Sequence, residues 1–179
     1  MTAFKIYPDE QAPTLDQLLN EQGYEIEGES NVMTCPIQSG LAPESIGFKA
    51  ETELSDWWLD AAAALNGISD GKRPYLRQIL QNIQPTHAFA SFRDGNEPVA
   101  VGLAVAEREW VGLFDIVTAK SKRRLGHGRN LVLNLMDWGF QQGAKNAYLQ
   151  VMSNNKPAID LYRGLGFEPR YTYWYRVRS

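Results

Sequence analysis

Residues 117–167 carry the pattern that most constrains what this chain can fold into. The pattern indicates a strand end, a basic loop with two glycines, a helix, a short strand and a second helix. Gly126 and Gly128 directly follow the basic run, and Leu131 and Leu135 after them have the spacing of one helix face. A glycine loop that opens a helix is the outline of a phosphate-binding site.

The physical basis of this prediction is the backbone at a helix start. The first amide N–H groups of a helix have no intrahelical partners, and together with the positive end of the helix dipole they attract anions. Glycine lets a ligand oxygen approach the main chain, because it has no Cβ. Arg123, Arg124 and Arg129 add positive charge around the loop. The predicted ligand group is a phosphate, and a solvated basic loop is the alternative.

Two familiar nucleotide-binding loops do not fit the neighbouring residues. A Rossmann fingerprint needs a third glycine, where this chain has Leu131, and an acidic residue about 20 positions on, where it has Gln150. A Walker loop needs Gly-Lys-Ser or Gly-Lys-Thr, and the sequence contains neither. The sequence therefore excludes both nucleotide-binding loops.

A third pattern does fit. Residues 123–128, RRLGHG, resemble the R/Q-x-x-G-x-G/A signature of the GNAT superfamily, whose members transfer an acyl group from acyl-CoA to an amine nitrogen. Residues 155–167, NKPAIDLYRGLGF, resemble the second motif of the same superfamily. Both motifs occur in the family's order and at its usual separation, and the resemblance covers about residues 45 to 179.

The resemblance implies acetyl-CoA as the cosubstrate and no metal. In this family the glycine loop holds the CoA pyrophosphate, and backbone amides of the preceding strand hold pantetheine and polarise the thioester carbonyl. The acetyl group then passes directly to the amine in a ternary complex. The implied cosubstrate-binding residues are Ile116, Val117, Thr118, Arg123, Arg124, Gly126, His127, Gly128, Arg129 and Asn155.

The resemblance also implies catalytic roles. Tyr162 matches the family's general acid, which protonates the departing thiolate. Some family members carry a glutamate base five residues before the motif asparagine, and this chain has Gln150 there. Asp115 is the candidate base in its place, acting through an ordered water. Glu107, Glu109 and water itself stay open as alternatives.

The chain is expected to adopt an α/β (α+β) GNAT fold, a mixed central β-sheet flanked by helices, with a short N-terminal extension. From about residue 31 the expected order is strand, two helices, three strands, helix, strand, helix and strand. Ser55 and Pro74 indicate the starts of the paired helices, and residues 94–96, Asp-Gly-Asn, indicate a hairpin. The helix after the glycine loop is expected over residues 129–142.

The sequence predicts an N-terminal extension at residues 1–44 and a GNAT domain at residues 45–179. Residues 1–13 show no hydrophobic period, so they are expected to be irregular. A helix with Thr14 as its N-cap is expected to follow and to end at Gly23.

The end of this N-terminal helix resembles the second motif when it is shifted by 143 positions, from Gly23 to Gly166. The same shift sets Leu19 on Tyr162. We therefore hypothesise that residues 1 to about 40 are the remnant of a preceding, degenerate copy of the GNAT fold. A chance likeness between two helices that end in glycine and an aromatic residue is the alternative.

Composition narrows the class of protein. Hydrophobic residues make up 44% of the 179-residue chain and charged residues 22%, which is typical of a soluble globular domain. Cys35 is the only cysteine, so the predicted compartment is the reducing cytoplasm. The expected absence of a membrane segment rests on the lack of an apolar run of about 18 residues. A net charge of −3 argues against general nucleic-acid binding.

The expected partner is an amine acceptor, either a small molecule or a peptide. Neither nucleic acid nor a membrane is expected as a partner. The sequence leaves open the identity of the acceptor, the length of the acyl chain and the choice between monomer and homodimer. A non-catalytic acyl-CoA-binding or regulatory module of GNAT fold is the alternative function, because Gln150 replaces the family's glutamate.

Overall fold

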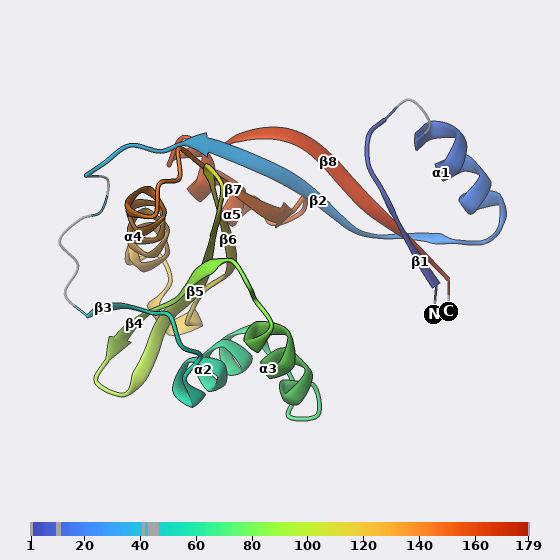
Figure 1. Cartoon of the computed structure of the whole chain (residues 1–179). Helices are drawn as coiled ribbons and strands as arrows, with labels where there is room; N and C mark the ends of the chain where they lie inside the picture. The colour runs from blue at the N-terminus through green and yellow to red at the C-terminus, as the bar shows by residue number, and fades with distance from the viewer. Residues whose placement is uncertain (1, 10–11, 41, 43–46, 179) are drawn as a thin grey trace. The chain divides into compact units, whose positions relative to one another are not determined.

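The computed structural model describes residues 2–9, 12–40, 42 and 47–178. The chain separates into two compact units, residues 36–147 and residues 1–35 with 148–179. Each unit combines strands and helices, as the expected α/β fold requires (Figure 1). Within the described segments, no helix is both long and apolar enough to cross a membrane.

The unit of residues 36–147 contains four antiparallel strands in the order β6-β5-β4-β3. The strands are β3 (Phe48–Glu51), β4 (Thr86–Asp94), β5 (Glu97–Glu107) and β6 (Trp110–Thr118). Asp94 pairs with Glu97, so the expected Asp-Gly-Asn hairpin is confirmed. The edge strand β3 was not predicted; it has four residues, too few to show a clear alternation.

Two helices cover one face of these strands and a third covers the other. They are α2 (Asp56–Asn66) and α3 (Arg73–Gln81) on one face, and α4 (His127–Gln141) on the opposite face. Ser55 accepts a hydrogen bond from the Trp58 backbone amide and caps α2 as predicted. Val101 and Leu103 of β5 pack in the cluster formed by α2 and α3.

The other face of β5 carries small residues because α4 lies very close to it. A Cβ added to Gly102 would stand 2.6 Å from Ile116 Cδ1 and 3.1 Å from Leu135 Cδ1. One at Gly139 of α4 would stand 2.6 Å from Val111 of β6. The helix begins two residues before the expected start at residue 129, at His127. The small residues on this face of β5 thus allow the close approach of α4.

The other unit contains β1 (Thr2–Ile6), α1 (Ala12–Glu21), β2 (Glu25–Pro36), α5 (Lys156–Arg163), β8 (Glu168–Arg178) and most of β7 (Asn146–Met152). Its strand order is β1-β8-β2-β7, and β8 pairs antiparallel with both β1 and β2.

Two expectations for this unit are wrong. Residues 2–6 are not irregular but form strand β1, whose only pairing lies at the other end of the sequence, on β8. Thr14 does not cap the first helix, because α1 already begins at Ala12, where the Asp9 carboxylate accepts a hydrogen bond from the Ala12 amide at 2.7 Å. The partner of β1 lies far along the chain, and Asp9 lies three residues before the first residue of α1. The periodic pattern of a helix or strand includes neither position.

The elements β1-α1-β2 and β7-α5-β8 repeat the same order, and their helices end alike. The Tyr24 amide donates to the Leu19 carbonyl, and the Phe167 amide donates to the Tyr162 carbonyl, each at 3.0 Å. The bonds lie 143 positions apart, the shift found in the sequence. The strand order β1-β8-β2-β7 is also symmetric. Exchanging β1 with β7 and β2 with β8 gives the same order, read from the opposite edge. The duplication and the boundary between residues 44 and 45 stay predictions.

A buried ion pair attaches α1 to β8. Arg176 is 6% exposed and donates to both carboxylate oxygens of Asp16, at 2.8 and 2.7 Å. It also donates to the Asn20 side chain and to the Tyr24 carbonyl, each at 3.0 Å. Trp174 donates to Asp16 as well, at 2.6 Å. The guanidinium and its counter-ion are therefore fully engaged, which a buried charge requires.

We predict that Asp16→Ala lowers the free energy of unfolding by about 3 kcal/mol, because Arg176 then stays buried without its counter-charge. The double variant Asp16→Leu with Arg176→Met should recover most of this loss. Urea unfolding at pH 7 measures both. Glu109→Ala removes an exposed ion pair with Lys145 and should cost less than about 1 kcal/mol.

The hydrogen bond from Arg176 is the main cause that holds the pKa of Asp16 below its ordinary value. The contribution of the pair is therefore present at neutral pH and is lost as the solution is acidified below about pH 4. Equal losses in Asp16→Ala and Glu109→Ala would show that the pair does not stabilise this unit.

Candidate functional site

The glycine loop connects β6 to α4 in the unit of residues 36–147. A short 3-10 helix, Lys120–Lys122, follows β6, and Arg123 Nε then donates back to the Thr118 carbonyl at 3.3 Å. The backbone turns at Arg124 and Gly126, whose φ angles are +61° and +85°. Arg124 is exposed, and its backbone has a left-handed conformation that residues other than glycine rarely adopt.

The start of α4 fits a phosphate. Gly126 occupies the N-cap position and has no side chain that could accept a hydrogen bond from the amides there. Those amides are the groups that an anion can bind, and α4 is a full 15-residue helix with its dipole aligned to them. Arg124 and Arg129 are exposed beside them, whereas Lys122 is paired with Asp94 at 3.0 Å. The arginines are thus better placed than Lys122 to serve an anion.

A bulge interrupts β6 just before the loop. Asp115 has a φ of +50°, and the pairing with β5 shifts between Val101, opposite Val117, and Leu103, opposite Phe114. Such a bulge turns the strand locally and changes where its backbone amides and side chains point. The predicted pantetheine contacts at residues 116–118 lie directly after it.

Asp115 is the candidate base. Its side chain is exposed at the surface, yet nearby protein atoms partly desolvate the carboxyl group, and this burial raises the pKa of Asp115. A raised pKa makes a carboxylate a stronger base. Glu107 and Glu109 lie at the opposite end of β6 from the loop. The eight residue steps from Trp110 to Thr118 separate the two ends of β6 by about 26 Å. Glu109 is also paired with Lys145.

The second motif lies in the other unit. Asn155 accepts a hydrogen bond from the Ala158 amide at 3.4 Å and is the N-cap of α5. Tyr162 is 7% exposed and packs edge-on against Phe167 with ring centroids 5.9 Å apart. Burial raises the pKa of Tyr162 to about 12. The phenol therefore keeps its proton at every physiological pH, which suits a proton donor.

Gln150 has a partner that sequence reasoning missed. The Tyr173 hydroxyl donates to Gln150 Oε1 at 2.5 Å. Tyr173 lies 23 positions after Gln150, on β8, so no local pattern connects the two residues. This bond fixes the side chain that stands where some relatives carry a catalytic glutamate.

Two tryptophans and the cysteine have structural roles. Trp57 stacks on the Arg93 guanidinium, 3.5 Å from the ring centre, and its indole N–H donates to the Asn96 carbonyl at 3.2 Å. Trp174 packs against the small cluster formed by Ile6, Ala12 and Leu19. Burial is the main cause that raises the pKa of the Cys35 thiol, so it is not a reactive thiolate.

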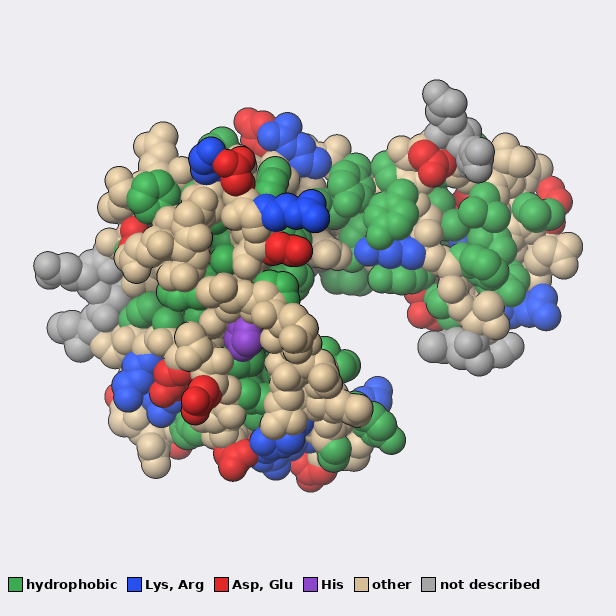
Figure 2. Space-filling model, in the orientation of Figure 1, with side chains coloured by type: hydrophobic (Ala, Val, Ile, Leu, Met, Phe, Trp, Pro, Cys, Tyr) green, Lys and Arg blue, Asp and Glu red, His purple; other side chains and the backbone are tan. Residues whose placement is uncertain are grey.

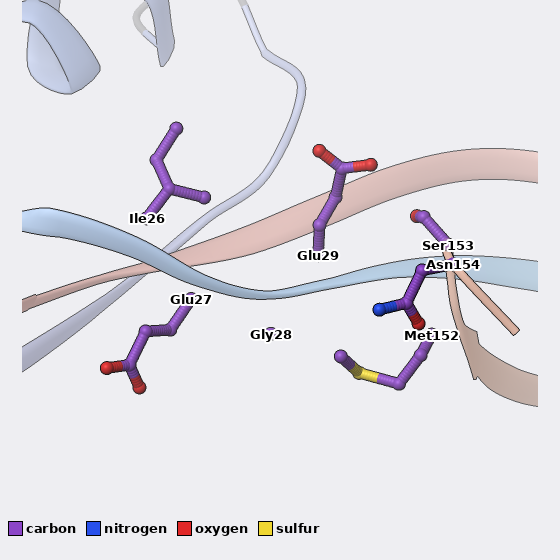
Figure 3. A pocket seen from close by; sticks show the side chains of 7 residues that line it. All are labelled: Ile26, Glu27, Gly28, Glu29, Met152, Ser153 and Asn154. Atoms are coloured by element: carbon purple, nitrogen blue, oxygen red, sulfur yellow. The ribbon is translucent and has the colours of Figure 1, made fainter.

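A shallow pocket of about 390 Å³ lies where β2 approaches the end of β7. Glu27 and Glu29 line it, but their side chains leave β2 on opposite sides, so they do not form a carboxylate pair (Figure 3). The Ser153 hydroxyl there is buried and makes no hydrogen bond to the described residues. In those residues no group of three His, Cys, Asp or Glu side chains is arranged to hold a metal ion.

A sequence profile described as "Probable histone acetyltransferase Rv0428c C-terminal" matches residues 12–176. The chain belongs to this family. It is a GNAT superfamily member, as the loop and the second motif predict. The match includes α1 and β2 as well as the residues from 45 onward, so this family's fold extends into the predicted N-terminal extension.

Relatives agree with this assignment. "Uncharacterized N-acetyltransferase YobR" of Bacillus subtilis is 29% identical over 168 residues, which is 92% of this chain and 68% of that protein. A GCN5-related N-acetyltransferase from Kribbella flavida is 25% identical with a TM-score of 0.65, over 97% of this chain and 66% of its own.

A GCN5-related N-acetyltransferase from Sphaerobacter thermophilus has a TM-score of 0.72 at 19% identity, over 97% of this chain and 58% of its own. At this identity the likeness shows the fold alone. This chain spans about two thirds of the length of the first of these two solved structures and about three fifths of the length of the second.

We predict that Tyr162→Phe changes how stability depends on alkaline pH. The folded-state pKa of Tyr162, about 12, lies above the ordinary tyrosine value near 10, so the unfolded chain loses this proton first. Stability is therefore fully present below pH 10 and falls as the pH rises toward 12. Unfolding free energies from pH 9 to pH 11 should fall less steeply in Tyr162→Phe than in the unaltered chain.

Tyr75→Phe is the matched control, because Tyr75 is 68% exposed on α3. Its curve should run parallel to that of the unaltered chain. If the Tyr162→Phe curve ran parallel too, Tyr162 would not be the desolvated phenol described above.

Proposed function

We propose that this protein is an N-acetyltransferase that moves an acetyl group from acetyl-CoA to a primary amine by direct transfer in a ternary complex. The observation that carries the proposal is the start of α4, where amides without a side-chain cap lie beside exposed arginines. Relatives that are named acetyltransferases, or are GCN5-related, support it.

In this proposal the loop binds the CoA pyrophosphate through the amides that follow Gly126 and through Arg123, Arg124 and Arg129. Gly128 leaves room for the phosphate oxygens, and His127 lies beside them. Amides of Ile116, Val117 and Thr118 hold pantetheine and donate to the thioester carbonyl. Asn155 contacts the cosubstrate in addition to capping α5. The bulge at Asp115 supports the role of Ile116, which lies outside the regular pairing of β5 with β6, whereas Val117 and Thr118 are paired with β5.

The proposed chemical step needs no metal. The lone pair of the neutral amine attacks the thioester carbon, a C–N bond forms, and the C–S bond breaks. Tyr162 donates its hydroxyl proton to the departing thiolate, and its pKa of about 12 means that this proton is present at neutral pH. Asp115 takes the proton of the amine through a water, and its raised pKa supports that role.

A non-catalytic acyl-CoA-binding module is the second candidate. The observation that favours it is Gln150, a side chain that cannot act as a base and that is held by Tyr173. The test is calorimetric titration with acetyl-CoA, together with a thiol-release assay across a panel of amines. Binding with amine-dependent thiol release supports the transferase. Binding without release by any amine supports the module, and no binding contradicts both.

We predict that Arg124→Glu weakens acetyl-CoA binding about tenfold or more, because a carboxylate replaces a cation at the predicted phosphate loop. Calorimetric titration measures the dissociation constant. Lys49→Glu is the matched control, since it makes the same charge reversal at an exposed position on β3. Equal affinities of the two variants would show that the loop does not bind the cosubstrate.

We predict that Tyr162→Phe lowers kcat about a hundredfold and leaves the affinity for acetyl-CoA within about twofold, because the proton is needed only when charge develops on sulfur. Steady-state thiol release with a saturating amine measures kcat. Tyr75→Phe, at an exposed tyrosine, should retain full activity. An unchanged kcat in Tyr162→Phe at every pH would remove Tyr162 from the acid role.

A further inference from the structure

Three tyrosine rings surround the ammonium group of Lys5 in the unit of residues 1–35 and 148–179. Lys5 Nζ lies 3.8 Å from the ring centre of Tyr173, 5.0 Å from that of Tyr7 and 5.8 Å from that of Tyr175. Each distance is within the range of a cation–π interaction. We name Tyr7, Tyr173 and Tyr175 the tyrosine cage.

The sheet places the cage on the face opposite α1. Trp174 and Arg176 of β8 contact α1, and side chains alternate along a strand, so Tyr173 and Tyr175 point to the other side. Lys5 pairs with Tyr175 in the β1·β8 ladder, which brings its side chain to the same face. Figure 2 shows side chains of the class that includes tyrosine gathered along β2 and β8, with basic side chains among them.

The rings have fixed positions. Tyr173 is 6% exposed, and its hydroxyl donates to Gln150. Tyr175 lies over the bulge at Gly28 of β2, where an added Cβ would stand 3.2 Å from the ring. Tyr173 and Tyr175 pack edge to face with centroids 5.8 Å apart, and Tyr7 lies 6.1 Å from Tyr173. Packing therefore holds Tyr173 and Tyr175 independently of Lys5, and the exposed Tyr7 completes the cage at its edge.

The cage favours the charged form of an amine. Burial lowers the pKa of Lys5, but a hydrogen bond with Tyr7 and the neighbouring phenol groups outweigh this effect, and the pKa lies above its ordinary value. An ammonium has no lone pair with which to attack a thioester. A group held in the cage is thus recognised but does not react.

We propose that the tyrosine cage binds a second, non-reacting ammonium group of the amine acceptor, and that the Lys5 side chain occupies this place until the acceptor displaces it. The inference rests on the proposed acetyl transfer. It names the acceptor class as a molecule with at least two amino groups, one neutral for reaction and one charged for recognition. A free diamine and a lysine-bearing peptide share this chemistry.

Two observations support displacement. Lys5 reaches the cage on a flexible four-carbon stem, so its ammonium can leave without moving β1. Tyr173 connects the cage to Gln150, the position that carries a base in some relatives, so a cation in the cage lies near a residue expected beside the reacting amine. Lys5 then lowers the affinity for every cationic acceptor, because the acceptor must compete with an ammonium that is already present.

The test uses the full chain without acetyl-CoA and follows its tyrosine ring signals by NMR during titration with propylammonium chloride. Lys5→Ala should bind the probe about tenfold more tightly than the unaltered chain, since the cage is then vacant. Lys49→Ala, at an exposed lysine of β3, is the control and should match the unaltered chain. Equal affinities of Lys5→Ala and Lys49→Ala would overturn the proposal.

Ring variants in the Lys5→Ala background locate the site. Tyr173→Phe keeps the ring and should retain binding, whereas Tyr173→Leu should lose it. Tyr7→Leu provides a second readout if Tyr173→Leu does not fold, because Tyr7 is 45% exposed at the end of β1. Binding that survives the loss of either ring would place the probe elsewhere and contradict the cage.

Two further arms identify the source of the cation, using 1,4-diaminobutane and a blocked peptide with one lysine. The compound whose affinity rises more in Lys5→Ala, relative to the unaltered chain, identifies the source of the cation. Unchanged affinity for both compounds contradicts the proposal. Acetylation of 1,4-diaminobutane is then assayed against that of propylamine. Cage binding without acetylation would refute the proposed transferase and leave the cation site in place. Acetylation without cage binding would refute the cation site alone.

Discussion

The close approach of α4 to β5 and β6 is the constraint on which the unit of residues 36–147 of this GNAT superfamily member depends. A methyl group at Gly139 would collide with the Cβ and both methyl groups of Val111, and one at Gly102 would force the end of the Ile116 side chain to move. The approach fixes the start of α4 and therefore the amides that follow Gly126. It also holds Ile116 inward and keeps the bulge of β6 next to the loop. Packing in the core thus orients groups at the surface.

The two units contribute different kinds of chemistry. The unit of residues 36–147 offers backbone amides and arginines, which attract an anion whatever the rest of the ligand is. The unit with the second motif offers side chains with shifted pKa values: burial raises the pKa of Tyr162, whereas the Tyr7 hydrogen bond and the neighbouring phenols raise that of Lys5 against the effect of burial. The proposed acetyl transfer uses both, because it needs an anion held in place and a proton donor that is protonated.

The elements around the site were predictable where their signals are local. The glycine loop, the Ser55 cap and the hairpin at residues 94–96 each depend on neighbours within a few positions. Strand β1 was missed because its partner lies on β8, far along the chain. The cage was missed for the same reason, since its rings come from both ends of the sequence. The pKa of Tyr162 depends on packing that no pattern encodes.

The pairing of β1 with β8 joins Thr2 to Arg178, across almost the whole sequence. Closing so long a loop costs chain entropy before the contact returns any energy, so this ladder belongs to the slow part of folding. On the ribosome, β1 and β2 emerge long before their common partner is made. The edges of these strands stay unpaired while the rest of the chain is synthesised. During this interval they can pair wrongly or be bound by a chaperone.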